Sequence, residues 1–571
     1  MRKVILFLPL LLLTLSFCSQ PQQGLNEVKV RLPLEPETLS PANYAGAEAV
    51  QIINLLFQSL LVVDLEKDKL QPALATNMPS IVRQDSLTLF TYELRENATW
   101  SDGSPVTAGD VAFTLKVLKA PLVNNDRIKP QVEFIRDIRL DNTNPRKFTF
   151  VCVGYAPEME LLTGDFFILP SYLFDPQGLL KSIQVADLSD DLSGLENNAD
   201  LKAFADKFNA INFKNDKALL QGSGGYLLDN HTPGQYLVLQ RKQNWWGNES
   251  HLSHLTAKPE RISFHIIPDN TTALLALKNQ QLDVLDNIPA AEFDQFKADK
   301  AFTKNFALHT PDAYECTYVG LNSRLAKFAD KRTRQAIAQL LDVNSMIQVS
   351  QQSYATPTVS IIPPSIKEYY NNSLKAREYN LAKAKSLLSA AGWSREQDGW
   401  YKIINGKKTR LTIEVVYRAG NTNFENAALV FQQGAAKAGI PVTLQAMENS
   451  LLSQKLKAHE FDMFFRSLSG NPFAFNFKGL LGTSAAQLGG PNYTGFGDQA
   501  SDNLLDDINA AETTAEKAKL LKQFQATLYD EATFIPLYYQ KERIAVHNRF
   551  TNTKISGLSP NYDVSAFTLK N

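Results

Sequence analysis

The sequence has few of the residues from which metal and redox centres are built. Its 571 residues include three cysteines and seven histidines. Cys152 and Cys316 lie in apolar, strand-like runs, which favours buried free thiols, although two such cysteines can pair in an oxidising compartment. The closest histidines, His251 and His254, have no third ligand nearby, so a surface pair is favoured over a metal site. The sequence therefore predicts no metal and no cofactor.

The sequence also lacks an excess of charge of either sign. Lysine and arginine number 58 and aspartate and glutamate 59, a formal net charge of −1. A nucleic-acid-binding protein usually carries a basic patch, so no nucleic-acid partner is expected.

Motifs of nucleotide binding and catalysis are missing as well. The glycine-rich run Gly222 to Tyr226 lacks the Gly-Lys-Ser/Thr ending of a phosphate loop, which favours a structural turn. No Gly-X-Ser-X-Gly elbow is found, and we predict no catalytic residue and no enzyme activity.

Long hydrophobic runs are absent except at the N-terminus. The basic start Met1-Arg-Lys3 is followed by the apolar run Val4 to Leu15, which is too short to span a membrane. This pattern is typical of a secretory signal. Leu15-Ser-Phe-Cys18 resembles a lipobox and predicts a signal segment over residues 1–18 with a lipidated Cys18. Phe17 stands where a lipobox has a small residue, so ordinary cleavage near Ser19 or Gln20 remains the alternative.

One stretch in the first third of the chain organises the sequence. A strand is expected from Leu87 to Leu94, followed by a turn at Trp100-Ser-Asp-Gly103. Thr107 stands three residues before Asp110, the spacing of a capping box. We therefore expect a capped helix over Ala108 to Leu118, with a structural role.

The later part of the chain shows a strand, a helix and a strand in succession. Leu411–Tyr417 and Ile440–Met447 have strand character and flank the amphipathic helix Phe424–Gly439, which predicts a parallel pair. Phe461–Phe465 is a further strand, and Arg466–Pro472 is expected as the loop after it. Two other expected elements are a strand over Phe302–Leu308 and a helix over Phe328–Ile347.

The order and spacing of these motifs, from Val28 to Asn548, resemble those of the bacterial extracellular solute-binding protein family 5, the periplasmic oligopeptide- and dipeptide-binding proteins of ABC transporters. This resemblance implies an α/β, three-lobed periplasmic-binding-protein fold (type II, cluster C-like) with a discontinuous first lobe. Lobe I would comprise residues 19–60, 215–310 and 541–571, lobe II residues 61–214, and lobe III residues 311–540. Crossing segments near Pro311 and Tyr539 would act as hinges.

The resemblance also implies a function. The protein would be an extracytoplasmic substrate-binding lipoprotein of an ABC importer. It would capture a small peptide or peptide-like solute between two lobes and deliver it to permease and ATPase subunits. We expect a monomer in the periplasm that is held at the membrane by its lipid anchor.

Ligand-binding residues follow from the same resemblance. In dipeptide binders of this family an arginine just after a strand grips the ligand carboxylate, and Arg418 stands at the matching place. An aspartate later in the chain grips the ligand amine, but the segment Arg466–Pro472 has no carboxylate. A buried ammonium would lack its counter-charge there. The segment offers Arg466, which with Arg418 favours an anionic ligand, and the neutral groups Ser467, Ser469 and Asn471.

A second wall of the binding site is expected near the N-terminus. Family residues after a Leu-Asp-Pro motif line the cleft, and this motif corresponds to Leu39-Ser-Pro41. Tyr44 can stack on a ligand or donate a hydrogen bond to it. Glu48 can replace the missing carboxylate.

Three alternatives remain open. The same fold can bind an oligosaccharide, an opine-like compound or a metal chelate. The protein can be a hydrolase, which turnover of a substrate would reveal. It can also be a peptide receptor or chaperone without a transport role, which the absence of neighbouring permease and ATPase genes would favour.

Overall fold

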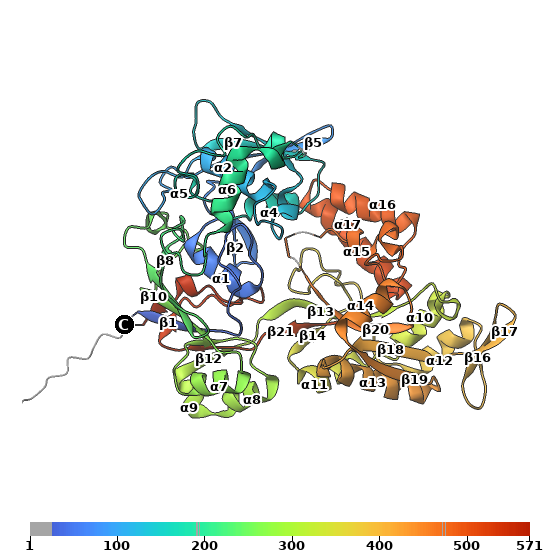
Figure 1. Cartoon of the computed structure of the whole chain (residues 1–571). Coiled ribbons are helices and arrows are strands. Elements are labelled where there is room, and N and C mark those ends of the chain that lie inside the picture. The colour runs from blue at the N-terminus through green and yellow to red at the C-terminus, as the bar shows by residue number, and fades with distance from the viewer. Residues whose placement is uncertain (1–25, 190–191, 193, 471, 474, 571) are drawn as a thin grey trace, which may run out of the picture.

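Three main β-sheets form the framework of the protein (Figure 1). The computed structural model describes residues 26–189, 192, 194–470, 472–473 and 475–570. The sheets have seven, six and four strands, and we name the part of the molecule around each one the seven-, six- and four-stranded lobe. Two predicted functional residues, Cys18 and Asn471, lie outside the described residues.

The seven-stranded sheet collects strands from the beginning, middle and end of the chain, so the predicted discontinuous first lobe is confirmed. Strand β1 is parallel to β10 and β11, while β22 lies antiparallel between β12 and β11. In sheet order the strands are β12 (Phe306–His309), β22 (Ile544–His547), β11 (Val284–Leu285), β1 (Glu27–Leu32), β10 (Arg261–Ile266), β9 (Tyr236–Arg241) and β8 (Tyr226–Thr232). Its helices are α1 (Ala47–Leu56), α7 (Asn270–Lys278), α8 (Ala290–Ala298) and α9 (Lys300–Asn305).

The four-stranded sheet is antiparallel and holds the predicted capped helix against it. Asp110 accepts hydrogen bonds from the backbone N–H and the hydroxyl of Thr107, both at 2.9 Å, which confirms the capping box. Gly103 has a φ of 86°, as the predicted turn requires. The strands are β4 (Ser80–Gln84), β5 (Leu87–Glu93), β7 (Lys147–Val153) and β6 (Ile135–Leu140). The helices are α2 (Ala108–Lys119), α3 (Lys129–Val132), α4 (Met159–Gly164), α5 (Ser171–Phe174) and α6 (Ala199–Asn209).

The six-stranded sheet contains the predicted strand–helix–strand unit. Strands β18 and β19 pair in parallel on either side of α13 in the sequence, as expected. In sheet order the strands are β14 (Ala355–Pro357), β21 (Phe534–Lys541), β13 (Asp312–Leu321), β20 (Met463–Ser469), β18 (Ile413–Arg418) and β19 (Val442–Met447). The helices are α10 (Lys331–Ala338), α11 (Val343–Gln351), α12 (Leu381–Ala390), α13 (Thr422–Ala438), α14 (Asn449–Lys457), α15 (Lys478–Leu481), α16 (Gln499–Ala510) and α17 (Thr514–Glu531).

Hydrophobic clusters cover both faces of the six-stranded sheet. Val415 and Phe465 pack with α10 to α13 on one face, whereas Val416 and Phe464 pack with α14 to α17 on the other. Figure 1 shows α11 and α13 below the sheet and α15 to α17 above it. Because successive side chains of a strand point to opposite faces of the sheet, the face of every other residue in β18 and β20 follows from these positions.

Small sheets complete the structure. The hairpin β2 (Leu61–Asp64) and β3 (Lys69–Pro72) follows α1, and β23 (Phe550–Thr551) pairs with β24 (Thr568–Leu569) near the C-terminus. A three-stranded sheet is formed by β15 (Ser394–Arg395), β16 (Trp400–Ile404) and β17 (Lys407–Arg410).

Two element predictions were wrong in part. The strand expected over Phe302–Leu308 begins as helix α9, because Asp299 caps the first helical N–H groups of Ala301 and Phe302. The single helix expected over Phe328–Ile347 is divided into α10 and α11, since Asp342 accepts from the N–H of Ser345 and starts a second helix.

The glycine-rich run before β8 has the structural role that the sequence favoured. A Cβ on Gly224 would lie 2.4 Å from the carbonyl oxygen of Leu55, so only glycine lets this chain pass the end of α1. Cys152 and Cys316 are buried free thiols in different sheets, as predicted. Among the described residues, no helix has the length and apolarity to cross a membrane.

Candidate functional site

Arg418 and Arg466 lie on adjacent strands of the six-stranded sheet, on the same face. Val416 of β18 is paired with Phe464 of β20 in parallel, and each arginine follows two residues later. The alternation along each strand therefore directs both arginine side chains to the face that carries α14 to α17. Like charges so placed create a positive potential that favours an anion.

Neither arginine forms an ion pair with a carboxylate among the described residues. The exposed side chain of Arg418 forms no hydrogen bond or ion pair with the described residues. The half-buried Arg466 guanidinium lies 5.7 Å from the centre of the Tyr493 ring, a cation–π contact, and has no carboxylate partner in the described part of the chain. Both cationic groups remain available to a negatively charged ligand.

The predicted loop over Arg466–Pro472 begins instead as a strand, so that part of the prediction was wrong. Strand β20 continues to Ser469 because the long strand β13 offers it partners up to Glu315. Ser467 and Ser469 therefore lie on the sheet face opposite to Arg466. The Ser467 hydroxyl lies 3.4 Å from that of Thr317, and Ser469 is exposed. The structure separates these two serines from the pair of arginines.

Tyr44 and Glu48 lie near the start of α1, in a different part of the molecule. The ring of Tyr44 packs at 5.3 Å from that of Phe167, and burial raises the pKa of its hydroxyl. Glu48 lies half-buried in the first turn of α1. No hydrogen bond or ion pair among the described residues joins Tyr44 or Glu48 to Arg418 or Arg466.

Two carboxylates that the sequence did not reveal lie near Glu48. Burial raises the pKa of Asp286 to about 6, and the charge of Glu48 adds to this while Arg31 opposes it. Burial raises the pKa of Glu542 to about 7, and the repulsion from Asp286 contributes. Asp286 therefore lies near both Glu48 and Glu542, and the three form a partly buried group of carboxyl side chains. The only signal in the sequence was the nearness of Glu542 to a predicted crossing segment.

Glu542 also lies where the chain crosses between the two larger sheets. Its N–H donates to the carbonyl oxygen of Pro311 at 3.0 Å, so the two crossing segments are bonded to each other. The first crossing is at Pro311, as expected. The second comes at Glu542 and Arg543, because Tyr539 still belongs to β21.

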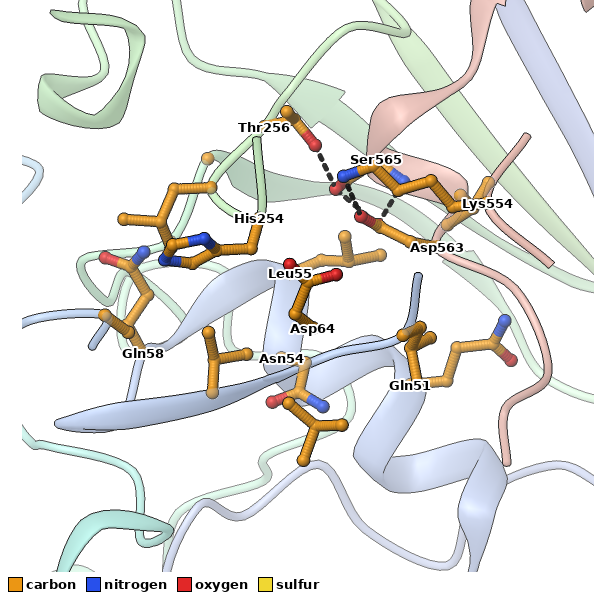
Figure 2. Close-up of a pocket in the computed structure, with 18 of the residues that line it drawn as sticks. Gln51, Asn54, Leu55, Gln58, Asp64, His254, Thr256, Lys554, Asp563 and Ser565 are labelled. Carbon is orange, nitrogen blue, oxygen red and sulfur yellow. Dashed lines mark hydrogen bonds and ion pairs between the residues drawn. The ribbon is translucent and has the colours of Figure 1, made fainter. Parts of the chain in front are cut away.

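A polar pocket of about 130 Å³ lies between α1, the β2–β3 hairpin and the C-terminal segment (Figure 2). Its walls include two glutamines, Gln51 of α1 and Gln58 just after this helix, which are only 7% and 8% exposed. Nε2 of Gln51 and Oε1 of Gln58 find no hydrogen-bond partner among the described residues. The volume admits about four water molecules.

His254 forms part of this pocket. Its Nε2 donates to the carbonyl oxygen of Pro72 at 3.0 Å, and burial lowers its pKa. On the far wall Thr256 and Ser565 are joined through their hydroxyls at 2.9 Å (Figure 2). The described residues contain no group of three or more His, Cys, Asp or Glu side chains that could hold a metal ion.

The comparisons with known proteins agree with this architecture. The profile of the bacterial extracellular solute-binding proteins, family 5 (middle region), matches residues 69–486. The oligopeptide-binding protein AppA of Bacillus subtilis is 24% identical over 555 residues, which cover 96% of this chain and 92% of AppA. Heme-binding protein A of Haemophilus influenzae is 26% identical over 318 residues, which cover 55% of this chain and 54% of that protein.

Among solved structures, the unliganded open form of the murein tripeptide-binding protein MppA superposes with a TM-score of 0.75. The two chains are 19% identical, and the match covers 96% of this chain and 98% of MppA. Because the family profile covers most of the chain, this protein belongs to the bacterial extracellular solute-binding proteins of family 5. Its α/β fold is the periplasmic-binding-protein fold of that family.

Proposed function

We propose that this protein captures a small peptide or peptide-like solute outside the cytoplasmic membrane and delivers it to the permease and ATPase subunits of an ABC importer. Family membership supports this function, as does the similarity to AppA, a protein described as oligopeptide-binding. The protein would act as a monomer in the periplasm. It would carry out no chemical step itself.

The pair formed by Arg418 and Arg466 is the observation that carries the proposal. Two arginines on adjacent strands and on one sheet face, without a carboxylate partner among the described residues, suit a ligand carboxylate. Glu48, Asp286 and Glu542 offer the opposite charge near the crossing segments. A zwitterionic solute needs one group of each kind.

Closure of the lobes would bring these groups to the ligand. We propose the boundaries 19–60, 215–310 and 541–571 for lobe I, 61–214 for lobe II and 311–540 for lobe III, which the three sheets support. Rotation about Pro311 and Glu542 would move the sheet of Arg418 relative to that of Asp286. A ligand that contacts both would stabilise the closed state.

Tyr44 would form part of the wall on the side of lobe I, where its half-buried ring can stack on a ligand. Ser467, Ser469 and Asn471 stay as weaker candidates for neutral hydrogen bonds. Since Ser467 and Ser469 lie on the face opposite to Arg466, we assign the anion to the arginines alone.

The N-terminal segment would place the protein at the membrane. We propose that the signal segment within residues 1–18 is cleaved before Cys18 and that Cys18 is lipidated, with cleavage near Ser19 or Gln20 as the alternative. The polar residues from Ser19 to Gly24 would then tether the folded chain to the lipid.

The decisive experiment identifies what the protein carries. Mass spectrometry of molecules that co-purify with the mature protein should find a peptide or a related carboxylate. Thermal-shift screening of peptides should then show a specific rise in melting temperature. A protein that binds no peptide but a neutral sugar would contradict the proposed role of the arginines.

A metal chelate or a heme-like ligand is the second candidate. The relative from Haemophilus influenzae is described as heme-binding, and such ligands also carry carboxylates that two arginines can bind. The missing carboxylate in the described part of 466–473 favours a ligand without an ammonium group. Including heme and iron chelates in the thermal-shift screen separates the two candidates.

A further inference from the structure

A second cavity, of about 400 Å³, lies within the six-stranded lobe. It is bounded by the junction of α10 and α11, the segment 357–359 after β14, the segment 376–379, the end of α17 and strand β21. These elements are labelled in the lower right part of Figure 1, except α17, which lies above them. Neither Arg418 nor Arg466 lines it, so it is separate from the proposed ligand site.

The walls of this cavity are mainly apolar. Five apolar residues that line it are each at least nine-tenths buried: Leu341, Val359, Leu528, Ile535 and Leu537. The volume falls in the range of small-molecule sites, which run from about 300 to 1,000 Å³. A ligand with an apolar body would therefore fit it.

One wall carries a positive charge that is held in a fixed orientation. The guanidinium of Arg377 lies 3.7 Å from the centre of the Tyr529 ring and donates a hydrogen bond to the Tyr529 carbonyl oxygen. The Tyr529 hydroxyl in turn donates to the carbonyl oxygen of Lys375 at 3.2 Å. Burial lowers the pKa of Arg377, while Tyr529 and the charge of Asp530 oppose this shift.

Three carboxylates near Arg377 are bound by other partners. Asp530 is bound by Lys331 at 2.5 Å, and Glu531 by Arg334 at 2.7 Å. Asp342 accepts from the N–H and the hydroxyl of Ser345 at the start of α11. Glu378, which also lines the cavity, is exposed and forms no ion pair with the described residues.

Arg377 therefore has no ion-pair partner in the described part of the chain. A partly buried charge without a counter-charge is unfavourable, and an anion from solution would relieve this cost. The hydrogen bond to the Tyr529 carbonyl oxygen uses one N–H group of the Arg377 guanidinium. The remaining N–H groups can bind a carboxylate.

We propose that this cavity is a second binding site, for an amphipathic anion whose apolar body fills the cavity and whose carboxylate pairs with Arg377. The site goes beyond solute capture between the lobes. It would hold the end of α17 to the segment 376–379, within one lobe.

Calorimetric titration with three ten-carbon probes tests the proposal. Decanoate, decanol and decyltrimethylammonium share the apolar body and differ in the charge of the head group. Decanoate should bind, decanol should bind at least about tenfold more weakly, and the ammonium compound should not bind. Equal affinity for decanoate and decanol would show that no anion is recognised.

Two variants locate the site. Arg377→Gln should weaken the binding of decanoate at least about tenfold. Arg332→Gln removes the same charge from the surface of α10 in the same lobe and should have no effect. Unchanged affinity in Arg377→Gln would overturn the pairing.

A further variant keeps the test decisive if Arg377→Gln does not fold. Ala376 is exposed and lines the cavity, so Ala376→Trp should leave the fold intact and block the entrance. Decanoate binding should then be lost while binding of the transported solute is kept. Decanoate binding that survives in Ala376→Trp would place the molecule elsewhere and refute the site.

Discussion

Tyr314 donates a hydrogen bond from its hydroxyl to Oδ2 of Asp68 at 2.8 Å, linking strand β13 of the six-stranded sheet to the turn of the β2–β3 hairpin. The other oxygen of Asp68 accepts from the hydroxyl of Ser556 at 2.7 Å, in the C-terminal segment. One half-buried carboxylate thus ties together three parts of the chain beside the crossing at Pro311.

Replacing Asp68 should loosen this junction. Asp68→Asn turns one acceptor into a donor and leaves one of the two hydroxyls without its partner, at a cost of about 1–3 kcal/mol of unfolding free energy. Tyr314→Phe removes only one of the two bonds and should cost less. Denaturant unfolding measures both, and equal stability of Asp68→Asn and the parent protein would contradict the role of Asp68.

Arg418 should contribute to affinity and little to stability. Because its side chain is exposed and makes no bond to the described residues, Arg418→Gln should change the unfolding free energy by less than about 0.5 kcal/mol. The same change should weaken binding of a carboxylate ligand by about 2–5 kcal/mol, measured by calorimetry with the co-purified solute. Arg332→Gln is the matched control. If both variants bind equally well, Arg418 does not hold the ligand.

The carboxylates near the crossing segments should make stability depend on pH. The pKa values of Asp286 and Glu542 are raised to about 6 and about 7, so the folded protein holds their protons more tightly than the unfolded chain. Their contribution to stability is complete below the unfolded pKa of about 4 and is lost as pH rises through about 6 to 7.

The variants Asp286→Asn and Glu542→Gln should flatten that dependence. Between about pH 4 and pH 8 the parent protein should lose about 2–3 kcal/mol more than either variant, since one pKa unit corresponds to about 1.4 kcal/mol. Asp126→Asn, which changes an exposed carboxylate, should keep the slope of the parent. Identical slopes in all four proteins would show that these two carboxyl groups do not titrate as described.

Gly224 should tolerate no side chain. An added Cβ would meet the carbonyl oxygen of Leu55 at 2.4 Å, a backbone atom that cannot move alone, so Gly224→Ala should cost about 2–4 kcal/mol. Gly194→Ala is the control, because a Cβ there meets nothing within 4 Å. Thermal unfolding of the two variants measures the difference, and similar midpoints would argue against the close approach.

The proposed lipid anchor has its own test. Cys18→Ser should release the protein from the membrane fraction and abolish incorporation of a labelled fatty acid, since thioether and acyl attachment both start from this cysteine. Cys152→Ser serves as the control for loss of a thiol. A wild-type chain that is soluble and unlabelled would favour ordinary cleavage near Ser19 or Gln20.

Local patterns in the sequence predicted the elements that are determined by neighbours in the chain. The capped helix after Thr107 and the parallel pair of β18 and β19 were correct because spacing and periodicity carry that information. Strand β20 was predicted too short. Its continuation through Ser469 depends on the distant strand β13, which no local pattern reports.

The candidate site likewise combines residues that the local sequence pattern indicated with relationships that depend on distant parts of the chain. Arg418 stands at the end of a strand, as its position in the pattern indicated, and its relation to Arg466 required the register of the sheet. Asp286 and Glu542 are far apart in the sequence, and their raised pKa values come from burial at the junction of two lobes. Neither their nearness nor their burial can be read from composition or spacing.

The position of β22 determines when the protein can finish folding. This strand, Ile544–His547, lies between β12 and β11, so a nascent chain that ends before it has two unpaired strand edges inside the largest sheet. During synthesis the seven-stranded sheet cannot close before Ile544–His547 has been made. The largest sheet therefore closes only after every strand of the four- and six-stranded sheets has been made.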